Sequence, residues 1–194
     1  MLEEISLAYE PHRIDIIADE SHDPAFLALN PNGKIPAIYD PHGPSGTPLA
    51  LFESGAILLY LGEKTGQFIS ADPNSRYGTI QWMMWQMGGA GPMFGQFGFF
   101  NKFAGKSMRT SARAAATQPN QRGCSVSSTN GSRCATGTDY SVAGISLLGW
   151  VRNLIGFYEA REIVGFDRFL RVQVWLDRGL ARPAVQHGLQ VTAA

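Results

Sequence analysis

The sequence has no long apolar run. No stretch approaches the roughly twenty consecutive apolar residues that a membrane-crossing helix requires. The first four residues, MLEE, also lack the basic and apolar regions of a secretion signal. We therefore expect a cytoplasmic protein with no membrane partner.

The sequence also lacks an excess of charge and a metal-binding pattern. Its 16 Lys and Arg residues balance 16 Asp and Glu residues, so we expect no nucleic-acid partner. Its 2 cysteines, Cys124 and Cys134, form neither a CxxC pair nor a group with histidines. We expect no metal site, because the histidines are not spaced to act with acidic or nucleophilic residues; they are His12, His22, His42 and His187.

The most informative residues of the sequence lie in two neighbouring motifs, NPNGKIPAI at residues 30–38 and LFESGAILLYL at residues 51–61. The segments from Ile35 to Asp40 and from Pro48 to Phe52 are typical of strands. The turn-forming residues 41–47 separate them. The motifs therefore predict a hairpin-like unit.

A helix is predicted directly after this hairpin. Ser54 precedes an apolar run that ends near Gly62 or Gly66, so we expect its hydroxyl to cap the helix. The first helical turn offers N–H groups and partial positive charge to a carboxylate, and Glu53 offers negative charge to an ammonium. The pair can hold both ends of an α-amino-acid group, although most Glu-Ser pairs before helices are only caps.

The dipeptide Ile35-Pro36 supplies a second binding element. When its peptide bond is cis, the backbone groups of Ile35 can face outward and pair with a peptide ligand as a short added strand. Most Ile-Pro pairs are ordinary loop residues, so this function depends on the combination with Glu53 and Ser54.

Together these motifs resemble the glutathione-binding half of a cytosolic glutathione transferase. The sequence QWMMWQMGGAGPM at residues 81–93 is similar to the bacterial nu-class branch, the disulfide-bond oxidoreductases, whose members reduce disulfides with glutathione. The resemblance covers residues 1 to about 104 and 139–194. It implies glutathione as co-substrate, a small-molecule electrophile or disulfide as second substrate, and a homodimer.

The resemblance also implies which residues form the site. Ile35 would pair its backbone with the cysteinyl unit of glutathione, while Glu53 and Ser54 would hold the γ-glutamyl group. Lys34 and Pro36 complete the expected glutathione-binding set.

An α+β fold with two domains is expected. A thioredoxin-like α/β domain at residues 1–66 and a linker at 67–75 precede an all-helical domain at 76–194. In the helical domain, Arg76 opens a long helical stretch, and further helices are predicted at Val151 to Val164, at Phe169 to Leu180 and from Pro183 onward.

The first part of the helical domain is rich in aromatic and sulfur-containing residues. Burial preference favours a helix–helix core or a dimer face for most of them. The resemblance suggests that some line the second-substrate pocket; these are Trp85, Met93, Phe94 and Phe97.

The family pattern is incomplete at the start of the chain, which we interpret as an N-terminal truncation. The resemblance places a strand and the residue that polarises the glutathione sulfur before Leu2, so no catalytic residue is assigned and activity is uncertain. The missing strand would lie between a strand near Tyr9 to Ile16 and the strand at Ile35 to Asp40. Unless another chain or a rearrangement fills the gap, we therefore expect a divided sheet, a poorly ordered N-terminal domain and rapid amide exchange over residues 1–60.

Residues 105–138 also depart from the pattern. They contain no Asp or Glu, and Met108 and Val126 are their only large apolar residues. This composition is typical of a disordered basic segment. A pair of compensating frameshifts or a natural disordered loop explains it. After it, Ser141 begins a helix-capping box in which Gly144 replaces the expected acidic residue, so the reciprocal cap is lost.

Two functions follow as hypotheses. The first is glutathione-dependent thiol transfer or disulfide reduction. The second is a non-catalytic remnant that binds glutathione weakly or only dimerises.

Overall fold

The computed structural model describes residues 1–103 and 140–191. The unusual segment 105–138, with both cysteines, lies outside the described residues. The described part is α+β, as the sequence predicts, and consists of α1 (Pro24–Leu29), β1 (Ala37–Asp40), β2 (Leu49–Phe52), α2 (Ser54–Thr65), α3 (Pro73–Trp85), the π-helical turn η3 (Gln86–Ala90), α4 (Gly91–Lys102), α7 (Val142–Ile155), α8 (Leu170–Leu180) and α9 (Pro183–Gly188). Short 3-10 turns lie at Glu20–His22, Pro44–Gly46 and Phe166–Arg168.

The predicted hairpin is confirmed. Strands β1 and β2 pair antiparallel, with Ala37 opposite Phe52 and Asp40 opposite Leu49. Each strand begins directly after a proline. Strand β1 begins at Ala37 rather than at Ile35, and β2 begins at Leu49 rather than at Pro48. Because proline has no N–H to donate to the ladder, the residues before it do not extend the sheet.

The strand expected near Tyr9 to Ile16 is not formed. Residues 7–15 belong to no helix or strand, and the sheet of the described residues has two strands. A strand requires a neighbouring strand that satisfies its backbone groups. Neither β1 nor β2 pairs with residues 7–15. The expectation of rapid amide exchange over residues 1–60 stays a prediction.

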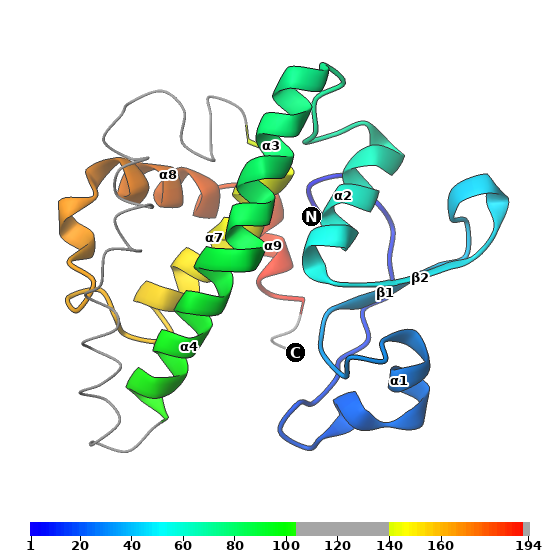
Figure 1. The fold of residues 1–194 in the computed structure, drawn as a ribbon, viewed down its shortest axis with the longest axis horizontal. Helices are drawn as coiled ribbons and strands as arrows, with labels where there is room; N and C mark the ends of the chain where they lie inside the picture. Colours follow the sequence, from blue (N-terminus) through cyan, green and yellow to red (C-terminus); the bar gives the residue numbers. More distant parts are fainter. Residues whose placement is uncertain (104–139, 192–194) are drawn as a thin grey trace.

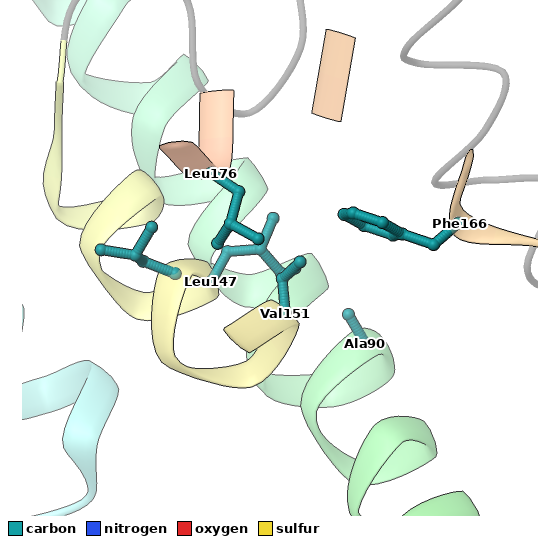
Figure 2. Close-up of a cluster of buried hydrophobic side chains, with 6 residues drawn as sticks. Ala90, Leu147, Val151, Phe166 and Leu176 are labelled. Carbon is teal, nitrogen blue, oxygen red and sulfur yellow. The ribbon is translucent and has the colours of Figure 1, made fainter. Parts of the chain in front are cut away.

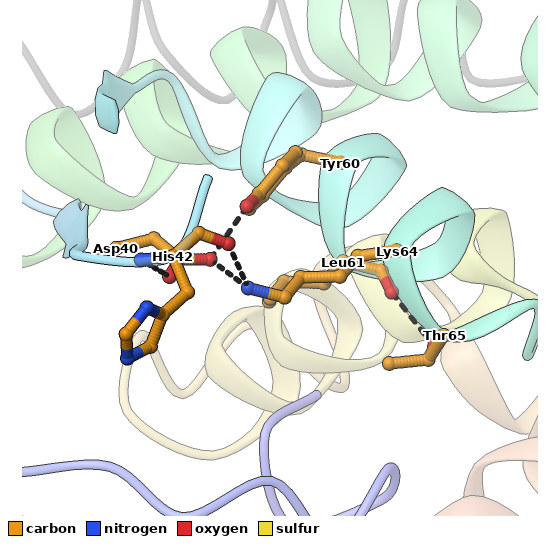
Figure 3. A network of polar contacts seen from close by, with 6 residues as sticks. All are labelled: Asp40, His42, Tyr60, Leu61, Lys64 and Thr65. Atoms are coloured by element: carbon orange, nitrogen blue, oxygen red, sulfur yellow. Dashed lines mark hydrogen bonds and ion pairs between the residues drawn. The ribbon is translucent and has the colours of Figure 1, made fainter. Parts of the chain in front are cut away.

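Helix α2 is fixed to the hairpin by a polar network around Asp40 (Figure 3). The Asp40 carboxylate accepts hydrogen bonds from the Tyr60 hydroxyl, at 2.5 Å, and from the Lys64 ammonium. Lys64 also donates to the backbone carbonyl of His42 at 2.9 Å. The Lys64 and Tyr60 bonds lower the pKa of Asp40 to about 2. The network thus joins the end of β1 to the last two turns of α2.

A long helical stretch runs beside α2 and consists of α3, η3 and α4 (Figure 1). It begins at Pro73, three residues earlier than predicted, because the carboxylate of Asp72 caps it by accepting the N–H of Ser75 at 2.9 Å. Met83 of α3 is fully buried against Leu58 of α2 and Val142 of α7. This cluster is where the two halves of the molecule meet.

A second apolar cluster lies within the helical half (Figure 2). Leu147 and Val151 of α7 pack with Leu176 of α8 and Phe166, and Ala90 of η3 completes the contact. Each of these side chains is buried. Helix α7 is therefore the central helix of this half.

The helix predicted at Val151 to Val164 is wrong in its bounds. Helix α7 spans Val142–Ile155, and the chain then turns through Gly156, which has low helix propensity. Glu159 adopts a positive φ of 54°, which is incompatible with a continuing helix. Helices α8 and α9 form within a residue of the expected bounds. Ser141 is the N-cap residue of α7, and its side chain makes no capping bond either.

The first residues of the chain are joined to α9. The guanidinium of Arg182 donates two hydrogen bonds to the carboxylate of Glu4, both at 2.7 Å, and stacks 4.1 Å from the ring centroid of Tyr140. Only 5% of the Glu4 side chain is exposed. Burial also raises the pKa of the Tyr140 hydroxyl. This contact joins the first residues of the chain to the start of α9 and to Tyr140.

We predict that Asp40→Asn reduces the dependence of stability on acid pH. The pKa of Asp40 is lower in the folded chain than its usual unfolded value near 3.9, so its contacts stabilise the fold above about pH 4 and are lost as the pH falls through about 2. Urea unfolding at several pH values should show the free-energy difference between wild type and variant shrinking over that range. The exposed Asp177→Asn serves as the control, and a difference independent of pH would contradict the prediction.

We predict that Arg182→Met lowers the free energy of unfolding by about 2 kcal/mol, because it leaves the buried Glu4 carboxylate without its charged donor. Urea unfolding measures the loss. The exposed Arg178→Met on α8 should change stability by less than about 0.5 kcal/mol. Equal effects of the two substitutions would show that the Glu4 contact contributes nothing specific.

Candidate functional site

The hairpin brings the two predicted halves of the site together. Ala37 lies opposite Phe52, so the next residues along each strand, Pro36 and Glu53, leave the sheet at the same end. Ile35 directly precedes Pro36 in the sequence, and Ser54 directly follows Glu53. The structure therefore collects four of the five expected glutathione-binding residues at one end of the hairpin, and the exposed Lys34 precedes them.

A tight turn before Ile35 sets the direction in which the chain enters the site. The buried Asn30 accepts the N–H of Asn32 at 2.9 Å and donates from its side-chain amide to the carbonyl of Lys34. Gly33 adopts a φ of 61°, which favours glycine, and donates to the carbonyl of Asn30 at 3.0 Å. The motif NPNG signals this turn, but sequence reasoning did not assign Asn30 its supporting role.

The backbone of Ile35 is exposed and unpaired among the described residues. The Ile35-Pro36 peptide bond is cis, the form that the sequence argument requires. Ile35 is 52% exposed, and no hydrogen bond to its backbone occurs within the described residues. Its N–H and carbonyl can therefore pair with an extended peptide, as an added strand does.

Glu53 differs from the prediction because it, and not Ser54, is the N-cap residue of α2. Its carbonyl accepts the first helical hydrogen bond, from Ile57 at 2.9 Å, and its side chain makes no capping bond. Glu53 has φ 69° and ψ 114°, a conformation that costs a non-glycine residue about 1–3 kcal/mol. The exposed carboxylate is thus held outside the helix, where it can meet an ammonium.

Ser54 is the first residue of α2, and its hydroxyl lies beside a sulfur atom. The Ser54 hydroxyl donates to the thioether of Met87 in η3, with 3.8 Å between Oγ and Sδ. Because the first helical bond starts at Ile57, the N–H groups of Ser54, Gly55 and Ala56 precede the helical ladder and can bind an anion. Sequence reasoning missed Met87, since no local signal joins positions 33 residues apart.

The four residues expected in the second-substrate pocket occupy different environments. Phe97 is 7% exposed and packs with Leu154 and Ala160, an environment typical of a helix–helix core. Phe94 and Trp85 pack against the Leu147 cluster, and Met93 is 41% exposed. A role in binding the second substrate stays a prediction for these residues.

The described residues contain no group of three or more His, Cys, Asp or Glu side chains that could hold a metal ion. The histidines are all exposed, as expected for surface roles; they are His12, His22, His42 and His187. Within the same part of the chain, no helix is both long and apolar enough to cross a membrane.

Known protein sequences that are similar to this chain include glutathione transferases and disulfide-bond oxidoreductases. Residues 1–64 match the family description "Glutathione S-transferase, N-terminal domain". The chain is 38% identical over 192 residues to the disulfide-bond oxidoreductase YfcG of Escherichia coli, covering 97% of this chain and 86% of YfcG. It is 32% identical to the disulfide-bond oxidoreductase YghU of the same organism, covering 93% of this chain and 63% of YghU.

Solved structures of glutathione transferases share the fold. One from Burkholderia graminis, with two glutathione molecules bound per subunit, has a TM-score of 0.90 and 50% identity and covers 98% of this chain and 81% of its own. One from Pseudomonas putida, with one glutathione disulfide bound per subunit, has a TM-score of 0.89 and 50% identity and covers 98% and 84%. These likenesses identify a thioredoxin-like N-terminal domain and an all-helical C-terminal domain. The chain therefore belongs to the glutathione S-transferase family, on the branch that includes the bacterial disulfide-bond oxidoreductases.

Proposed function

We propose that this protein binds glutathione at the end of the β1–β2 hairpin and uses it to reduce disulfides. The observation that carries the proposal is the convergence of a free Ile35 backbone, an exposed Glu53 carboxylate and the first turn of α2. These three groups complement the parts of a γ-glutamyl peptide. The solved relatives with bound glutathione support the choice of ligand.

The γ-glutamyl end binds at α2. Its carboxylate accepts hydrogen bonds from the Ser54 hydroxyl and from N–H groups of the first turn, where the helix dipole also favours negative charge. Its ammonium meets the carboxylate of Glu53, which the backbone conformation holds outside the helix. Opposite charges are thus matched at both ends of one amino-acid group.

The cysteinyl unit binds at Ile35. Its backbone N–H and carbonyl pair with the carbonyl and N–H of Ile35, and the adjoining Lys34 and Pro36 border this contact. The main-chain pairing fixes the direction of the peptide, so the thiol is placed relative to the hairpin without a contact from the Ile35 side chain.

The proposed reaction is thiol–disulfide exchange. One glutathione thiolate attacks a disulfide sulfur, forms a mixed disulfide and expels one thiolate. A second glutathione thiolate attacks the glutathione sulfur of that mixed disulfide, so two glutathiones are oxidised to glutathione disulfide and one disulfide is reduced to two thiols. The attacking species is the thiolate. The relative solved with glutathione disulfide holds the corresponding product.

The second substrate and the assembly belong to the same proposal. A small disulfide, or alternatively an electrophile, binds beside the helical half near Trp85, Met93 and Phe94. The protein acts as a cytoplasmic homodimer. The two disulfide-bond oxidoreductases among the relatives favour disulfide over electrophile as the substrate class.

We predict that Glu53→Gln raises the dissociation constant for glutathione about tenfold, because the neutral amide loses the charge-assisted bond to the ammonium. Isothermal titration calorimetry measures the constant. The matched control is Glu10→Gln, an exposed glutamate away from α2, which should leave the constant within about twofold. Equal binding by wild type and Glu53→Gln would contradict the placement of the ammonium.

We predict that the wild-type chain catalyses the reduction of bis(2-hydroxyethyl) disulfide by glutathione, and that Glu53→Gln lowers kcat/KM about tenfold. Formation of glutathione disulfide, coupled to glutathione reductase, measures the rate. Binding without turnover would reject the catalytic role and leave the glutathione-binding, non-catalytic alternative. Absence of both binding and turnover would reject the glutathione site.

A further inference from the structure

We infer that Met87 is a positioning residue for glutathione: its thioether holds the Ser54 hydroxyl in the free protein and yields it to the ligand carboxylate. The inference rests on the proposed function and adds to it a residue from the helical half of the molecule. The observation that carries it is the Ser54 Oγ to Met87 Sδ contact at 3.8 Å.

The path of the backbone brings Met87 to this position. Met87 belongs to the π-helical turn η3, which interrupts the long helix between α3 and α4. Such turns often re-aim side chains at functional sites. The side chain lies directly over the start of α2: a Cβ added to Gly55 would stand 3.1–3.2 Å from three atoms of Met87. A side chain at position 55 would therefore push Met87 back by a few tenths of an ångström, whereas glycine leaves it in place.

The Met87 side chain is partly buried against a core cluster. Met87 packs against the cluster that contains Leu58, Met83 and Val142. The sulfur is therefore not a mobile surface group that meets Ser54 by chance. It is held between the Met83 cluster and the first turn of α2.

The chemistry of the acceptor explains what the contact does. A thioether sulfur is a weak hydrogen-bond acceptor, whereas a carboxylate accepts a short, charge-assisted bond. The Ser54 hydroxyl has one proton, which it can direct to only one acceptor. When a carboxylate arrives, rotation about the Cβ–Oγ bond exchanges the weak bond for the strong one. A stronger acceptor at position 87 would compete with the ligand for this proton.

Apolar packing alone gives a different expectation. If Met87 served only to fill space, any change there would act on α2 as a whole, with or without the Ser54 hydroxyl. If it acts through the hydroxyl, the effect of a stronger acceptor must vanish when the hydroxyl is removed. A double-mutant cycle separates these cases.

The experiment measures glutathione dissociation constants of four proteins by calorimetry: wild type, Met87→Gln, Ser54→Ala and the double variant. Glutamine has nearly the length of methionine and places an amide oxygen near the sulfur position. We expect Met87→Gln to raise the constant about fivefold in the wild-type background and by less than about twofold in the Ser54→Ala background. The same fold-change in both backgrounds, or no change in either, would overturn the inference.

Met84→Gln is the matched control, because Met84 is 50% exposed on the same helical stretch. It should leave the constant within about twofold of wild type. Thermal unfolding of each variant reports whether the fold is retained.

A second measurement does not depend on the folding of Met87→Gln. In protein labelled with ¹³C at the methionine methyl groups, the Met87 signal should shift on titration with glutathione. The shift should be reduced at least about twofold in Ser54→Ala at equal saturation, because the hydroxyl exchange is absent. An unchanged shift would overturn the inference. Glutathione binding without coupling rejects only the role of Met87, whereas absence of binding by wild type rejects the proposed function and this inference together.

Discussion

The candidate site depends on the register between β1 and β2. With Ala37 opposite Phe52, Pro36 and Glu53 leave the sheet together, and the backbone of Ile35 and the first turn of α2 become neighbours. A shift of one strand by one residue would move its side chains to the other face of the sheet and offset Pro36 from Glu53. The contact of Asp40 with Tyr60 and Lys64 stabilises this arrangement, because it ties the end of β1 to the helix that begins the site.

The second constraint comes from the helical half. The π-helical turn η3 lies between α3 and α4, and the residues before it and at its end have different neighbours: Met83 packs against α2 and α7, whereas Ala90 packs in the cluster that contains Leu147. Met87, between them, contacts Ser54. The helical half therefore borders the first turn of α2 through Met87, which also packs against the cluster that contains Leu58, Met83 and Val142.

The sequence predicts local features of this molecule well. The hairpin, helix α2 and the proximity of Ile35 to Glu53 follow from short motifs in which turn residues, strand residues and a helix start are adjacent. The errors arise where tertiary contacts decide. Proline shortens the first strand, Glu53 rather than Ser54 is the N-cap residue of α2 and makes no side-chain capping bond, and α7 ends at Ile155 before Gly156. The Ser54–Met87 contact was beyond prediction, because it requires the path of η3 relative to α2.

The bidentate contact between Glu4 and Arg182 joins residues 178 positions apart. A contact of this sequence separation forms only when nearly all of the chain is available, and its closure entropy is among the largest that the fold must overcome. During synthesis, Glu4 leaves the ribosome long before its partner exists. The carboxylate then remains hydrated, and the segment around Glu4 reaches its final environment only after α9 has emerged. Completion of the N-terminal half is thus coupled in time to the formation of α9.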